Sequence, residues 1–162
     1  MKEITLVCKE LADLVAEWEP VLRKLREDII SQRRNAQNRT IKQILGHLID
    51  SSSNNIHRIV HLQYQSSPLI FPNYATLGNN DRWIAIQDYQ NEDWNTMIQL
   101  WKYSLLHLCH VMKNVNADKL SNEWISGAGK TVTLESMIVD FPGHLKLHLS
   151  EINDLINNDN AN

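Results

Sequence analysis

Cysteine is scarce in this sequence: the 162 residues include only Cys8 and Cys109, which lie in unrelated segments. Two distant cysteines exclude a disulfide framework, and the absence of a Cys-x-x-Cys spacing excludes a cysteine zinc site or a thioredoxin-like redox motif. Such sparing use of cysteine is typical of proteins from a reducing compartment. We therefore predict a cytoplasmic protein.

Long apolar runs and a strong net charge are also missing. No run of about eighteen apolar residues, the length that a membrane-spanning helix needs, occurs in the chain. Lys2, Glu3, Lys9 and Glu10 interrupt the place where a signal peptide would be apolar. The 16 basic and 19 acidic side chains give a net charge of -3, which provides no positive field for nucleic acid. We expect a soluble protein with neither a membrane nor a nucleic-acid partner.

What the sequence does contain is helical periodicity, with only five glycines and four prolines to interrupt it. Over residues 11–29 apolar side chains recur every three or four positions, and Pro20 is expected to kink or divide this helix. A second helix begins with a capping box formed by Thr40 and Gln43, and its apolar face continues to about residue 61 or 64. These two segments predict two amphipathic helices.

Two further helices are predicted over residues 91–115 and 138–155, where Pro142 should force a new start or a bend near Asp140. The 43% hydrophobic content suffices for a core without a disulfide or a structural metal. We predict an all-α fold over a single domain, residues 1–162: a four-helix bundle of up-down helices with a polar tail from about 157 to 162. The long connection between the second and third helices, residues 65–90, should cover one end of the bundle or a site.

Histidines give the most specific indication of chemistry. His144 and His148 stand four residues apart in the last predicted helix, so both rings lie one turn apart on or beside its apolar stripe. Two imidazoles there are costly to bury unless their nitrogens are satisfied, either by hydrogen bonds or by a divalent metal. The spacing therefore makes the pair candidate metal ligands.

His47 is the candidate third ligand, from the edge of the apolar stripe of the second helix. A polar strip follows it along the helix, which would either line a cavity or face solvent: Asp50, Ser51, Asn54 and Arg58. Asp50, Asn54 and Glu151 are candidates to orient the histidine rings, and Asp50 and Glu151 are also candidate general bases, hence the only candidate catalytic residues.

Other motifs are less suited to a site. His57 and His61 also stand four apart but fall farther from the apolar stripe, so we interpret them as surface residues. His107 and His110 are expected at the rim of the third helix. The segment 127–131 ends in Gly-Lys-Thr, but Trp124 stands where a phosphate-binding loop requires glycine, which excludes nucleotide binding.

The sequence resembles the DinB/YfiT-like superfamily of metalloenzymes over nearly its whole length, and two segments carry the motifs. They are residues 45–50, Leu-Gly-His-Leu-Ile-Asp, followed by Asn54 and Arg58, and residues 133–152, which contain the His-x-x-x-His pair. The chain departs from the family at Phe141-Pro142-Gly143, where relatives more often have uninterrupted helix. The resemblance implies a four-helix bundle in which His47, His144 and His148 hold a divalent metal, commonly nickel or zinc.

The resemblance implies activity only in outline. Relatives include transferases that use low-molecular-weight thiols such as bacillithiol or mycothiol, a mycothiol-dependent isomerase, and many proteins described only as metal-dependent hydrolases. Fold alone does not fix function. Our hypothesis is a metal-dependent hydrolase or thiol S-transferase that acts on a small molecule and forms a homodimer. The alternative is a non-catalytic bundle for binding or dimerisation, with incidental metal.

Overall fold

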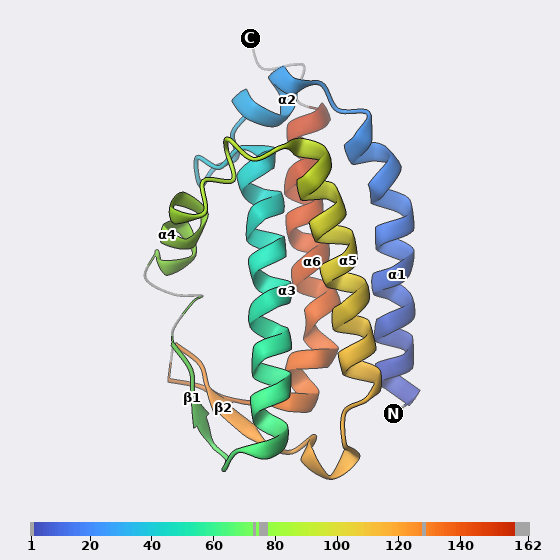
Figure 1. Cartoon of the computed structure of the whole chain (residues 1–162), viewed down its shortest axis with the longest axis vertical. Helices are drawn as coiled ribbons and strands as arrows, with labels where there is room; N and C mark the ends of the chain where they lie inside the picture. The colour runs from blue at the N-terminus through green and yellow to red at the C-terminus, as the bar shows by residue number, and fades with distance from the viewer. Residues whose placement is uncertain (1, 73, 75–77, 128, 158–162) are drawn as a thin grey trace.

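The computed structural model describes residues 2–72, 74, 78–127 and 129–157, and four long helices dominate it (Figure 1). They are α1 (Lys2–Arg23), α3 (Ile41–Tyr64), α5 (Trp94–Lys113) and α6 (Leu134–Asn157). The predicted four-helix bundle is confirmed. The predicted tail beyond Asn157 lies outside the described residues.

The order of the helices around the bundle follows from their contacts: α1 and α3 each pack against both α5 and α6. Helices α1 and α5 are antiparallel, since the Trp94 indole donates to the carbonyl of Leu22 where one helix starts and the other ends. Helices α3 and α5 are parallel, because the connection between them returns the chain to the end where α3 began (Figure 1). Helix α6 then runs antiparallel to α3, which sets residues near the start of α3 beside the second half of α6.

Capping explains where two of these helices begin. Thr40 accepts from the Gln43 amide while the Gln43 side chain accepts from the Thr40 amide, the reciprocal arrangement expected from the sequence. Asp93 caps α5 by accepting from the amide of Thr96. Both caps satisfy amides that have no partner within the helix.

Neither internal proline ends its helix. Helix α1 passes through Pro20 and ends at Arg23, and a separate short helix, α2 (Glu27–Gln32), carries the rest of the apolar stripe. The carbonyl that loses a donor at Pro20 belongs to exposed Ala16, where water can replace the missing hydrogen bond. Helix α6 likewise continues through Pro142. The expected alternative of a new start near Asp140 is therefore wrong, and the alternative of a bend stays a prediction.

The two long connections form structure together. The first contains β1 (Leu69–Ile70) and α4 (Asn79–Ile86), and the second contains the short 3-10 helix η1 (Ala117–Lys119), β2 (Glu123–Ile125) and β3 (Thr131–Thr133). Strand β2 lies between the other two, parallel to β1 and antiparallel to β3. This small sheet and α4 lie along the side of α3, as Figure 1 shows. Residues of β2, of α4 and of the polar strip line the same cavities.

The core is one continuous cluster of apolar side chains contributed by all four long helices. Trp101 of α5 is its largest fully buried member. The Tyr89 ring packs directly on Gly46, where a Cβ atom would lie 2.2 Å from a ring carbon. Among the described residues no helix combines the length and apolar character needed to cross a membrane.

Candidate metal centre

Three histidines converge between α3 and α6. One nitrogen from each of His47, His144 and His148 lies within 4.8 Å of the other two. The His47 and His148 ring centroids are 4.6 Å apart, and those of His144 and His148 are 4.7 Å apart. The antiparallel packing of α3 and α6 thus brings together the three residues that the sequence singled out, although they stand almost a hundred positions apart.

The hydrogen bonds of His47 orient its ring. Its Nδ1 lies 2.8 Å from the Tyr74 hydroxyl, and that hydroxyl donates its proton to the carbonyl of His47 at 3.3 Å. When the single tyrosine proton is donated to that carbonyl, the imidazole is the donor in the hydrogen bond at Nδ1. This tautomer leaves the Nε2 lone pair of His47 free.

The other two rings have polar partners as well. His148 Nδ1 lies 3.1 Å from Oε2 of Glu151, a carboxylate that can only accept, so Nδ1 carries a proton and the neutral form of the ring has its lone pair on Nε2. His144 Nε2 lies 3.2 Å from the Ser51 hydroxyl, which is compatible with either tautomer. The hydrogen bonds at Nδ1 of His47 and of His148 leave Nε2 as the other ring nitrogen of each.

Burial favours the neutral form of His47 and of His144. Desolvation, followed by the proximity of the other two histidines, lowers the pKa of His47 to about 2. Desolvation is also the main cause that lowers the pKa of His144 to about 4. Neutral imidazole is the form that binds metals, so protons compete weakly for these two ligands.

These pKa values predict how the stability of metal-free protein depends on pH. The folded-state pKa of each histidine lies below the ordinary value of 6.5. At pH values between that folded-state pKa and 6.5, the histidine is protonated in the unfolded chain but neutral in the folded chain. The free energy of unfolding should therefore fall as the pH drops below 6.5, by about 1.4 kcal/mol per pH unit for each histidine. Urea titrations of chelator-treated protein between about pH 7 and about pH 5.5 measure this slope. A His47→Asn/His144→Asn variant with the wild-type slope would contradict it.

The histidines open into a cavity of about 510 Å³ between α3, α6 and the small sheet. Its apolar wall includes Phe141 and Met137 from α6 and Trp124 from β2. Its cationic side chains are Arg39, which is paired with Asp81 at 2.6 Å, and Arg58. A small molecule could therefore reach the histidine nitrogens.

The two candidate catalytic carboxylates lie in different places. Glu151 contacts His148, as described, and its Oε2 also accepts from the Asn35 amide at 3.1 Å. Asp50 is buried but does not line the histidine cavity; its Oδ1 accepts from Tyr89 at 2.8 Å and from Gln87 at 2.7 Å. Desolvation raises the pKa of Asp50. Asp50 therefore holds the connection between α4 and α5 against α3.

The remaining polar-strip residues divide between two cavities. Ser51 and Arg58 are buried and line the histidine cavity, whereas Asn54, half-buried with its amide donating to the Asp50 carbonyl, lines a neighbouring one. The strip is thus not a solvent face. His57 is exposed as expected, and His61 is half-buried beside it.

Sequence reasoning missed the function of Tyr74 at this centre. The sequence places it only within the long connection, residues 65–90. In the structure its ring stacks against His47 with centroids 5.8 Å apart, and its hydroxyl lies 2.8 Å from Nδ1 of His47. No periodicity in the sequence indicates such a contact, because Tyr74 itself belongs to neither a helix nor a strand.

Comparison with known proteins rests on the fold. No family model matches the sequence, and no curated protein matches it. YfiT from Bacillus subtilis, described as a probable metal-dependent hydrolase with an unusual four-helix bundle topology, superposes with a TM-score of 0.81 at 16% identity, over 94% of this chain and 85% of that one. The chain therefore has the DinB/YfiT-like fold, which confirms the resemblance at that level.

A second neighbour has a longer chain. The mycothiol-dependent maleylpyruvate isomerase superposes with a TM-score of 0.73 at 13% identity, over 92% of this chain but only 60% of the isomerase. A mutant of that isomerase superposes with a TM-score of 0.72 at 12% identity. The present chain thus matches little more than half of the isomerase's length.

Proposed function

We propose that this protein is a metal-dependent enzyme whose divalent ion is held by His47, His144 and His148. The observation that carries the proposal is the convergence of three imidazole nitrogens within 4.8 Å of one another, at the wall of a cavity. Two of the three rings have their Nδ1 occupied by hydrogen bonds, which aims Nε2 toward a shared ion.

The donor set fits such an ion. Metal-to-imidazole bonds of about 2.0–2.1 Å place ligand nitrogens roughly 3–3.5 Å apart, so small ring rotations suffice for all three to bind. Three neutral nitrogen ligands suit nickel or zinc, the metals we propose. A structural zinc site would have a fourth protein ligand, whereas three ligands leave a position for a reactant.

When bound, the metal would act as a Lewis acid that makes a small coordinated nucleophile, either water or a thiol, more acidic. Hydrolysis and transfer of a low-molecular-weight thiol are therefore the two reactions that we propose. Structural neighbours described as a probable metal-dependent hydrolase and as a mycothiol-dependent isomerase support this pair of reactions. The homodimer and the cytoplasmic location stay predictions.

The chain's own residues would orient the metal ligands. Tyr74 would orient the ring of His47 through its stacking and its contact with Nδ1, and Glu151 would orient His148 by accepting from its Nδ1. Since Oε2 of Glu151 contacts both His148 and Asn35, we assign Glu151 a positioning role. Asp50 would support the site from farther away through Tyr89, which packs on Gly46 next to His47.

Removing the Glu151 carboxylate tests this positioning role. We expect Glu151→Ala to bind metal about 10–100-fold more weakly, the usual effect of losing a group that orients a ligating histidine. Asp154→Ala, an exposed acid one turn further along α6, is the matched control and should bind as wild type does. Competition with a fluorescent chelator measures both affinities. Equal affinities for the two variants would exclude the role.

Metal content and turnover test the proposed function together. Protein purified without a nickel column should contain close to one equivalent of a divalent metal by mass spectrometry. Chelation should abolish activity in a panel of ester and amide hydrolyses and of thiol additions to electrophiles, and one equivalent of metal should restore it. Protein that arrives without metal and takes up none at high affinity would support the non-catalytic alternative.

A further inference from the structure

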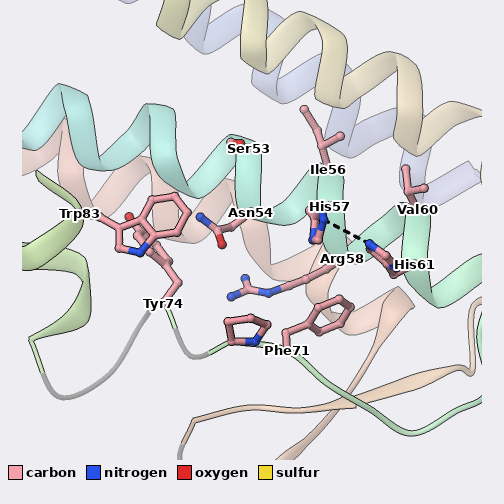
Figure 2. Close-up of a pocket in the computed structure, with 11 residues that line it drawn as sticks. Ser53, Asn54, Ile56, His57, Arg58, Val60, His61, Phe71, Tyr74 and Trp83 are labelled. Atoms are coloured by element: carbon pink, nitrogen blue, oxygen red, sulfur yellow. Dashed lines mark hydrogen bonds between the residues drawn. The ribbon is translucent and has the colours of Figure 1, made fainter. Parts of the chain in front are cut away.

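A second cavity adjoins the histidine cavity (Figure 2). Its volume is about 450 Å³, and its walls are largely apolar, with Ile56 and Val60 from α3, Phe71 after β1 and Trp83 from α4. Arg58 and Tyr74 line both cavities, so the two meet at these residues. A single small molecule could therefore extend from the apolar cavity to the histidines.

The charged group at this junction is the Arg58 guanidinium. The residue is only 8% exposed, yet no acidic side chain among the described residues pairs with it. The guanidinium instead stacks on the face of the Trp124 ring, with its Cζ atom 4.3 Å from the ring centroid. Figure 2 shows the side chain extending from α3 into the cavity, between Asn54 and Phe71 and toward Tyr74.

A buried guanidinium without a counter-ion is unfavourable. Desolvation lowers the pKa of Arg58, but an arginine stays charged at any physiological pH. Such a charge is costly unless an anion pairs with it, and the stacking on Trp124 compensates only in part. None of its nitrogens is among the fully buried unpaired atoms, so they remain accessible from the cavity. The guanidinium is thus placed to receive a ligand.

The chemistry of the surroundings favours a carboxylate. A guanidinium binds a carboxylate through two parallel hydrogen bonds. Arg39 is the other cation lining these cavities among the described residues, and Asp81 already pairs with it. A single available positive charge beside aromatic walls matches a monoanion better than a phosphate, which would require more donors.

We propose that Arg58 binds the carboxylate of the substrate, whose apolar part occupies the cavity between Phe71 and Trp83. The reacting group then faces His47, His144 and His148 across the junction. This inference names the substrate class of the proposed enzyme and so rests on that function, although binding at Arg58 is measurable without it.

The test compares two probes that differ only in charge: 4-phenylbutyrate and its neutral amide, 4-phenylbutyramide. Binding to chelator-treated protein is followed by calorimetry and by tryptophan fluorescence, since Trp83 and Trp124 line the cavities. Wild type should bind the carboxylate at least about tenfold more tightly than the amide, as expected for a charge-assisted bidentate pair. Arg58→Gln should bind both probes equally.

The controls separate charge recognition from folding. Arg26→Gln removes a surface arginine that is paired with Asp28, and it should keep the wild-type preference. Arg58→Lys keeps the positive charge but lacks the planar guanidinium, so it should retain only part of the preference for the carboxylate probe. Equal affinity of wild type for the two probes, no saturable binding of either, or an undiminished preference in a folded Arg58→Gln would each overturn the proposal. The wild-type comparison is decisive even where a variant fails to fold.

The use of metal-free protein separates this inference from the proposed function. A carboxylate preference in protein that never binds a metal would support the role of Arg58 and contradict the enzyme. Metal-dependent turnover without a carboxylate preference would support the enzyme and contradict the role of Arg58.

Discussion

Replacing His148 by alanine is expected to weaken metal binding by more than about 100-fold and to abolish metal-dependent turnover. The estimate is a lower bound, because losing a group that merely orients a ligand already costs about 10–100-fold. His148 is a buried residue whose ring lies 4.6 Å from that of His47, and two remaining imidazoles would leave the ion poorly held. Isothermal titration with zinc and with nickel measures the loss.

The matched control is another histidine in a helix. His110 is exposed on α5, so His110→Ala should keep the wild-type affinity and stoichiometry. His148→Ala should also fold, since removing an imidazole from a polar cavity leaves space that water can fill. A folded His148→Ala variant that binds metal as tightly as the control would show that the ion is held elsewhere.

Replacing Trp101 by alanine is expected to lower the free energy of unfolding by about 3–5 kcal/mol, the usual cost of deleting a large buried aromatic side chain. Trp101 is fully buried in the middle of α5, in the core that fixes the four helices against one another. Chemical denaturation of metal-free protein measures the change, and without metal the result reports on packing alone.

The matched change Trp101→Phe should cost far less, about 1–2 kcal/mol. The Trp101 indole N–H has no hydrogen-bond acceptor among the described residues, so phenylalanine removes an unsatisfied donor together with some volume. If Trp101→Phe were as destabilising as Trp101→Ala, a hydrogen bond of the indole N–H would contribute more to stability than the packing of the ring, which would contradict this prediction.

Much of the fold could be predicted because helices leave local signals. The capping box of Thr40 and Gln43 marks the start of α3, and the spacing of apolar residues along α5 is enough to predict that it is a helix. The two prolines were harder, because a proline's effect depends on whether the carbonyl one turn earlier can find water. The small sheet was not foreseen, since it joins β1 to strands that lie more than fifty residues later.

The candidate site was predictable in part for the same reason. The spacing of His144 and His148 places both rings on one helix face, and His47 lies on the inner edge of another helix. Tyr74 and Arg58 depend on tertiary structure instead. The sequence placed Arg58 on a polar strip, but only the tertiary structure shows that its guanidinium stacks on Trp124 of β2 and that it lines two cavities.

Anomalous diffraction from crystals of the metal-loaded protein, collected at the absorption edge of the bound metal, tests the central claim most directly. We predict a strong anomalous peak within bonding distance of one nitrogen each from His47, His144 and His148, with the cavity side of the ion open to a reactant. The absence of a peak there, or a dominant peak at another pair such as His57 and His61, would contradict the account.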